Sequence, residues 1–185
     1  MALTPTTLIP LGFIAPDFSL PDVVTEQQKS FQTIRGEKGT LVMFICNHCP
    51  FVVHIREELV RLAKEYMPKG IGMVAISSNN VETHPQDGPE LMKTLAKEEG
   101  FPFPYLYDET QAIAKAYEAA CTPDFSVFDS NDKCVYRGQL DGSRPGNGVL
   151  NDGKEMRAVF DLLLKGSLVP EEGQIPSMGC NIKWK

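Results

Sequence analysis

A chain of 185 residues is long enough for one well-filled domain, and its length alone gives no reason to expect two. Its net charge of -6 and its scattered lysines and arginines argue against a nucleic-acid-binding surface. No apolar run approaches the roughly 18 residues needed to cross a bilayer, and two prolines interrupt the N-terminal segment where a secretory signal would be apolar. We therefore expect a soluble, cytoplasmic protein that binds neither nucleic acid nor membrane.

The first half of the chain predicts a strand–helix–strand unit. Residues 12–20 predict a loop that leads into a short strand, and residues 29–34 are expected to pair back on it as a hairpin. Residues 40–45 are continuously apolar, as expected for a central strand that is covered on both faces. An amphipathic helix follows over 51–66, and residues 71–77 predict a second buried strand.

The second half predicts alternating helices and strands after a polar loop. Helices are expected to begin at Pro89, after Asp108, and after a cap at Asn151 or Asp152. Strands are expected at 103–107, 124–128 and 134–138, whereas 78–88 form the polar loop and 174–185 a tail without a regular period. The order of elements predicts an α/β domain with one mostly buried mixed sheet and helices on both faces.

Five cysteines occur in the chain, and two of them are separated by only two residues. They are Cys46, Cys49, Cys121, Cys134 and Cys180. An odd number of cysteines in a chain of this size argues against a disulfide framework, which small secreted domains need. In a reducing compartment, a close pair such as Cys46 and Cys49 is typical of a catalytic or metal-binding site.

The pair lies between the predicted central strand and the predicted helix, which favours redox chemistry. Proline has no N–H group to donate, so Pro50 places the start of the helix within residues 46–50, with Asn47 as a suitable N-cap. Unpaired N–H groups and the helix dipole should then face Cys46 and favour its thiolate, and a protonated His48 would add a second stabilising charge. In such settings a cysteine has a pKa of roughly 3.5–7.5 rather than about 8.5. We expect Cys46 to be the nucleophile and Cys49 to resolve the mixed disulfide.

Two other interpretations of the cysteine pair are possible besides a catalytic site. The cysteines could be simple core residues, or Cys46, His48 and Cys49 could bind zinc. Adjacent His48 and Cys49 rarely bind one ion together, and no second Cys-x-x-Cys or His pair completes a tetrahedral set. Pro50 stands where a c-type haem site requires histidine. We therefore expect neither a metal nor a cofactor.

Three segments resemble the thioredoxin-like superfamily, specifically the redoxin branch that contains peroxiredoxins and TlpA/ResA-like proteins. They are Ala15-Pro16-Asp17-Phe18, Cys46-Asn47-His48-Cys49-Pro50 and Thr122-Pro123-Asp124-Phe125. The resemblance covers about residues 12–165 and implies a thioredoxin-like α/β fold. In that fold a central mixed β-sheet is flanked by helices, with an N-terminal β-hairpin and an insertion after the second core strand. Residues 1–185 would form a single domain with 167–185 as a C-terminal tail.

The resemblance also implies roles for Thr122 and Pro123 in positioning the substrate. A cis Thr122–Pro123 bond would lie against the cysteines, and the backbone of Thr122 would pair with an extended substrate peptide. Two features depart from the pattern. Ile45 stands where thioredoxins and TlpA/ResA-like proteins usually carry tryptophan, and the proline and threonine of the peroxiredoxin Pro-x-x-x-Thr-x-x-Cys signature are missing before Cys46.

These observations favour a thiol–disulfide oxidoreductase with a redox-active Cys46–Cys49 disulfide. Its expected partners are a protein disulfide, or a small thiol or peroxide substrate, and a thiol reductant. One alternative is an antioxidant thiol peroxidase in which Cys46 becomes a sulfenic acid. The other is a redox-regulated binding or metal-site protein on the same fold.

Four other candidates are expected to have structural roles. Cys121 should lie near the pair as a small packing residue. Cys180 could act as a distant resolving thiol, but a tail folded onto the domain is the simpler interpretation. His54 is expected to be a partly exposed helix residue, and Arg144 a loop residue that meets water.

Overall fold

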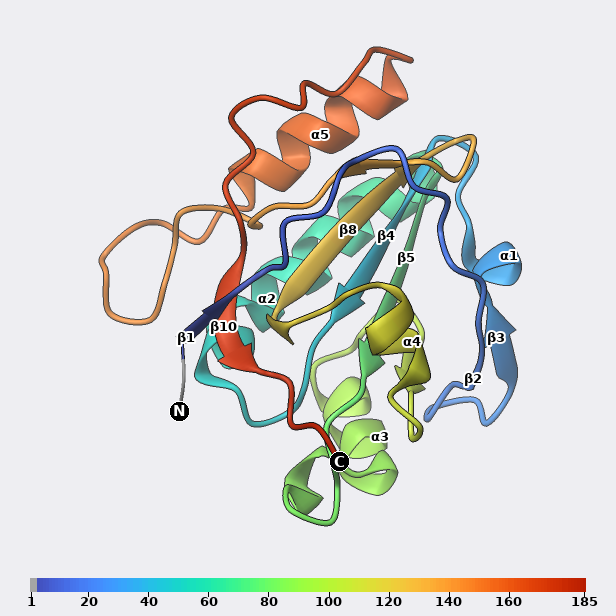
Figure 1. Ribbon diagram of the computed structural model, residues 1–185, viewed down its shortest axis with the longest axis vertical. Helices are drawn as coiled ribbons and strands as arrows, with labels where there is room; N and C mark the ends of the chain where they lie inside the picture. The colour runs from blue at the N-terminus through green and yellow to red at the C-terminus, as the bar shows by residue number, and fades with distance from the viewer. Residues whose placement is uncertain (1–2) are drawn as a thin grey trace.

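The computed structural model describes residues 3–185 and is built around a five-stranded sheet in the order β6-β5-β4-β8-β9 (Figure 1). The central strand β4 pairs in parallel with β5 and antiparallel with β8. All six residues of β4 are buried, which confirms the prediction of a strand covered on both faces. The strands are β4 (Gly39–Phe44), β5 (Ile71–Ser77), β6 (Tyr105–Tyr107), β8 (Asp124–Asp129) and β9 (Cys134–Tyr136).

Helices cover both faces of this sheet, as expected for a mixed α/β fold. Leu41 and Met43 of β4 belong to a core cluster that also contains residues of α2 (Pro50–Tyr66), α3 (Pro89–Glu98) and α5 (Lys154–Leu164). Val42 and Phe44 point to the opposite face, where they pack with residues of α1 (Phe31–Ile34) and α4 (Ala112–Ala116). This alternation of buried side chains follows from the two-residue period of a strand.

Three predicted details need correction. The hairpin between β2 (Ser19–Pro21) and β3 (Gln28–Ser30) is confirmed, but residues 31–34 form α1 because Ser30 and Thr33 make a reciprocal capping box. Helix α2 begins at Pro50 with Cys49 as its N-cap, so Asn47 is not the cap. Helix α5 has Gly153 as its N-cap, although the Asp152 carboxylate accepts a hydrogen bond from Lys154 N at 3.1 Å.

The two ends of the described chain pair with each other, and one of them pairs with a short strand before Pro123. The result is a second sheet, which the sequence did not predict. Its order is β1-β10-β7, with β1 (Leu3–Pro5), β10 (Met178–Asn181) and β7 (Cys121–Thr122) all antiparallel (Figure 1). Cys180 stands opposite Thr122 in this sheet. A Cβ atom at Gly179 would lie 1.9 Å from the carbonyl oxygen of Thr122, so only glycine allows β10 to approach β7 this closely.

The predicted polar loop 78–88 packs against the segment that carries Cys46 and Cys49. It contains a 3-10 helix η2 (Pro85–Asp87), and the carboxylate of Asp87 is fully buried. No helix within residues 3–185 is long and apolar enough to cross a membrane.

Candidate active site

The two cysteines of the close pair lie in the short connection between β4 and α2. Cys46 follows the strand by two residues, and Cys49 caps the helix whose first residue is Pro50. Both side chains are buried, and both are thiols in the structure. The short connection fixes the two sulfur atoms close together, because a helix N-terminus held against a central strand leaves the backbone little freedom.

Thr122 and Pro123 form the wall opposite the cysteines, as the resemblance implied. The Thr122–Pro123 bond is cis. The Thr122 hydroxyl lies 3.5 Å from Cys46 Sγ, and the Thr122 carbonyl oxygen accepts a hydrogen bond from the Cys49 thiol at 3.1 Å. One threonine therefore contacts both sulfur atoms through two different groups.

The backbone edge of Thr122 is occupied by the protein's own C-terminal strand. Thr122 pairs with Cys180, and Ile182 N donates to Ala120 O at 3.1 Å in the same ladder. Antiparallel hydrogen-bonded pairs recur every second residue, so Thr122 and Cys180 form such a pair as well. In this structure β10 therefore occupies the backbone edge of Thr122, where the resemblance places an extended substrate peptide.

Asp87 is the main site residue that sequence reasoning missed. Its Oδ1 accepts hydrogen bonds from the backbone N–H groups of Asn47 and His48 at 2.8 and 3.3 Å. Its Oδ2 accepts from Asn79 Nδ2 at 2.8 Å and lies 2.7 Å from His48 Nδ1. The N–H groups expected to face Cys46 are therefore bonded to a buried carboxylate. Only a long-range contact reveals this, and an aspartate in a polar loop gives no local signal.

His48 lies beside Cys46, but its orientation is set by Asp87. The same atom, Nδ1, is 2.7 Å from the Asp87 carboxylate and 3.9 Å from Cys46 Sγ. A catalytic Cys–His–Asp triad uses the two ring nitrogens for the two partners, and here one nitrogen faces both. The His48 ring stacks on His84 with centroids 5.2 Å apart.

The pKa of Cys46 is raised, whereas the sequence predicted a lowered one. The hydrogen bond with Cys49, burial and the nearby Asp87 carboxylate all raise the pKa of Cys46. The hydrogen bond from Cys46 lowers the pKa of Cys49, and a further one from Cys180 acts in the same direction. The two thiols thus act as a pair, which loses its first proton below the usual thiol value and its second well above it.

Cys180 makes the second contact that the sequence did not predict. Its Sγ lies 2.9 Å from Cys49 Sγ, and the residue is buried. The expectation of a tail folded onto the domain is correct in outline, but the tail delivers a third thiol to the pair. Cys121 and Cys134 are buried, and their thiols donate to backbone carbonyl oxygens at 3.5 and 3.6 Å.

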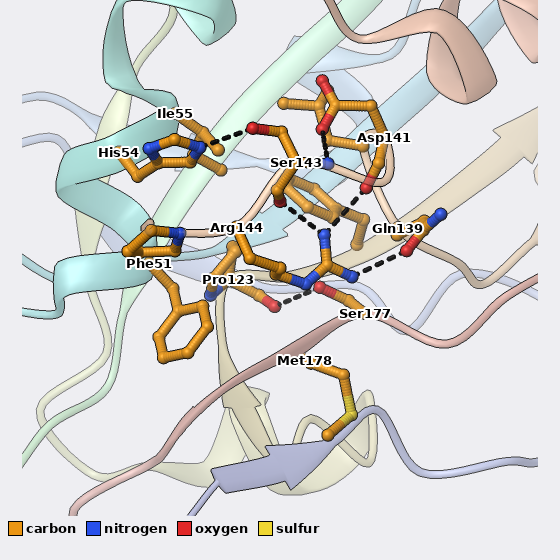
Figure 2. Close-up of a pocket in the computed structure, with 13 residues that line it drawn as sticks. Phe51, His54, Ile55, Pro123, Gln139, Asp141, Ser143, Arg144, Ser177 and Met178 are labelled. Atoms are coloured by element: carbon orange, nitrogen blue, oxygen red, sulfur yellow. Dashed lines mark hydrogen bonds between the residues drawn. The ribbon is translucent and has the colours of Figure 1, made fainter. Parts of the chain in front are cut away.

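A small pocket between Phe51, Pro123 and the 139–145 loop is closed by its own side chains (Figure 2). His54 Nε2 lies 2.6 Å from the Ser143 hydroxyl, and Arg144 donates to Gln139 Oε1 at 2.6 Å and to Asp141 O at 2.8 Å. The free space of about 10 Å³ has room for roughly one water molecule. His54 and Arg144 therefore hold the loop in place.

A metal ion would have to compete with this hydrogen-bond network. Cys46 Sγ, His48 Nδ1 and an Asp87 oxygen lie within 4.8 Å of one another, and they are donor types that zinc accepts. However, Asp87 already accepts from three N–H groups and faces the histidine nitrogen that an ion would need. The group thus fits a structural hydrogen-bond centre better than a metal site.

Comparison with known proteins identifies the family. Residues 11–152 match the family model described as Redoxin, which is most of the chain. The chain belongs to the Redoxin family. No curated protein matches it significantly.

Two solved structures are similar to this chain over nearly its whole length, and a third is similar over most of it. An uncharacterized conserved protein from Geobacillus kaustophilus is 56% identical with a TM-score of 0.97, over 100% of this chain and 97% of that one. A hypothetical protein from Sinorhizobium meliloti is 44% identical with a TM-score of 0.95, over 98% of each chain. The thioredoxin domain of a thiol-disulfide oxidoreductase from Bacteroides vulgatus is 16% identical with a TM-score of 0.63, over 83% of this chain and 99% of that one. The last likeness shows a shared thioredoxin-like fold.

Proposed function

We propose that this redoxin is a thiol–disulfide oxidoreductase that cycles between a Cys46/Cys49 dithiol and a Cys46–Cys49 disulfide. Family membership supports a thiol redox role, and the geometry of the pair supports the specific reaction. The observation that carries the proposal is the pair of buried thiols between β4 and α2, both of which are contacted by polar groups of Thr122.

The reaction begins with proton exchange inside the pair. When Cys46 passes its proton to Cys49, the Cys46 thiolate forms, and the new Cys49 thiol is placed to donate to the Thr122 carbonyl oxygen at 3.1 Å. The Thr122 hydroxyl, 3.5 Å from Cys46 Sγ, can donate to that thiolate. Thr122 thus stabilises the state in which Cys46 can attack, while Pro123 fixes the backbone of the loop.

The covalent steps are two successive thiol–disulfide exchanges. The Cys46 thiolate attacks one sulfur of a substrate disulfide, and the other sulfur leaves as a thiolate that takes up a proton. Cys49 then loses its proton and attacks the Cys46 sulfur, which releases the second substrate thiol and leaves the Cys46–Cys49 disulfide. A thiol reductant restores the dithiol.

The activity is tested by dithiothreitol-driven reduction of a protein disulfide such as insulin. The wild type should accelerate the reaction, and Cys46→Ser should abolish the acceleration because serine cannot form a mixed disulfide. Cys134→Ser is the matched control, since Cys134 is a buried strand cysteine in the other core cluster. Full activity in Cys46→Ser would refute the proposal, as would peroxide consumption far faster than disulfide reduction in a parallel assay.

One observation favours a second candidate, a redox-regulated metal-site protein. It is the convergence of Cys46, His48 and Asp87 within 4.8 Å. Metal analysis of protein purified without chelators distinguishes the two proposals. A stoichiometric ion lost on Cys46→Ser would replace the catalytic assignment. The cytoplasmic location, the reductant and the physiological partner stay predictions.

A further inference from the structure

The C-terminal strand holds a third thiol against the redox pair. Cys180 Sγ is 2.9 Å from Cys49 Sγ, so these two sulfur atoms are in direct contact although 131 positions separate them in the chain. Cys49 thus has a neighbouring sulfur on each side, Cys46 and Cys180. Such an arrangement permits a disulfide to move from one neighbour to the other.

The position of Cys180 is set by the strand that carries it. β10 is the middle strand of the sheet β1-β10-β7, with Leu3 and Thr122 as the partners of Cys180 on its two sides. Gly179 allows the close approach to β7, and the Ser177 hydroxyl donates to Pro123 O at 2.7 Å. Cys180 is only 3% exposed, so the sulfur meets the pair and hardly meets solvent. A tail that only covered the domain would not need this pairing on both sides.

We propose that Cys180 is a second resolving thiol, which attacks Cys49 and converts the Cys46–Cys49 disulfide into a Cys49–Cys180 disulfide. This inference rests on the proposed function, because an external disulfide must first oxidise Cys46 and Cys49. The relay itself needs no further oxidant. The Cys180 thiol loses its proton and bonds to Cys49 Sγ, the Cys46–Cys49 bond breaks, and Cys46 leaves as a thiolate that takes up the proton.

The product would differ from the first disulfide in its consequence for Cys46. Cys46 is a thiol again and can form a mixed disulfide, but Cys49 can no longer resolve it. The relay therefore keeps the two-electron oxidation as a disulfide inside the protein and changes the chemistry available at Cys46.

The cross-link can be tested without catalytic activity. Trypsin cuts after lysine and arginine, so residues 39–56 contain both Cys46 and Cys49, whereas residues 166–183 contain Cys180 alone. In Cys46→Ser, oxidised glutathione should join these two peptides through Cys49 and Cys180. This product should exceed any cross-link to Cys121 or Cys134 by at least tenfold. Cys46→Ser/Cys180→Ser should not form it, and Cys46→Ser/Cys134→Ser should form it normally.

The wild type then tests the order of events. After oxidation and a quench with N-ethylmaleimide, the disulfide within 39–56 should appear first and the link to 166–183 later, with Cys46 alkylated. The proposal is overturned if oxidised Cys46→Ser lacks the cross-link, or if Cys180 stays alkylated in all oxidised wild-type protein. Failure of the insulin assay would refute the proposed function and leave the cross-link measurement in Cys46→Ser unaffected.

Discussion

The side-chain hydrogen bond between Cys46 and Cys49 is the largest cause of the pKa shifts of both thiols, raising that of Cys46 and lowering that of Cys49. The backbone N–H groups of Asn47 and His48 are bonded to Asp87, which leaves the sulfur–sulfur hydrogen bond as the main stabilisation of a thiolate. Asp87 also raises the pKa of Cys46, so the first negative charge of the pair rests on Cys49.

The coupling predicts a pH-dependent thiolate that needs both cysteines. The reduced wild type should show one thiolate absorbance at 240 nm with a midpoint below the usual value of about 8.5. Below that midpoint both thiols are neutral, and above it the pair carries one charge. Cys46→Ala removes the donor of the stabilising hydrogen bond and should move the Cys49 midpoint upward, whereas Cys134→Ser should keep the wild-type curve. A low midpoint that survives in Cys46→Ala would show that the pair is not coupled.

At the scale of elements, β10 is as much a part of the site as α2 is. It fills the backbone edge of Thr122 and carries the sulfur that contacts Cys49. Gly179 is the residue that permits this, because a side chain there would collide with the Thr122 carbonyl oxygen.

Gly179→Ala should separate β10 from β7. We expect a loss of about 1–3 kcal/mol in the free energy of unfolding, since the added methyl group has no space. Combined with Cys46→Ser, it should also lower the yield of the Cys49–Cys180 cross-link. Gly142→Ala is the matched control, because its Cβ would meet only Val149 Cγ1 at an ordinary 3.9 Å, and its effect should stay within about 0.5 kcal/mol. Urea unfolding of both variants gives the comparison, and equal stabilities would contradict the close packing of β10.

The sequence predicted the central sheet well and the second sheet not at all, for a physical reason. β4 and β5 are long apolar runs, and α2 has a clear helical period, so their local patterns specify them. β1 and β10 have only three and four residues, and they exist because each pairs with a distant segment. The site divides in the same way. Cys46, Cys49, Thr122 and Pro123 were predictable from motifs, whereas Asp87 and the position of Cys180 depend on long-range contacts.

For the whole molecule, the two possible disulfides differ greatly in the loop that they close. A Cys46–Cys49 bond spans three positions, whereas a Cys49–Cys180 bond joins residues 131 positions apart and ties the C-terminal strand to the core. Cross-linking over a long loop removes more conformational freedom from the unfolded chain.

Oxidation should therefore stabilise Cys46→Ser strongly. In the chain-entropy model a loop of this length adds up to about 4–5 kcal/mol to the free energy of unfolding. Thermal unfolding of oxidised and reduced Cys46→Ser should show a clear rise in Tm on oxidation, whereas Cys46→Ser/Cys180→Ser should show none. An unchanged Tm in a protein whose cross-link has been verified by mass would contradict a well-fitted Cys49–Cys180 bond.

The most direct test of the central claim is a trapping experiment with Cys49→Ser. In this variant residues 39–56 contain Cys46 as their single cysteine, so any adduct on that peptide is unambiguous. Incubation with a protein disulfide should give a stable mixed disulfide at Cys46, because Cys49 is no longer there to resolve it and Cys180 contacts Cys49 rather than Cys46. A mixed disulfide on another cysteine, or continued turnover by Cys49→Ser, would contradict the assignment of Cys46 as nucleophile and Cys49 as resolving thiol.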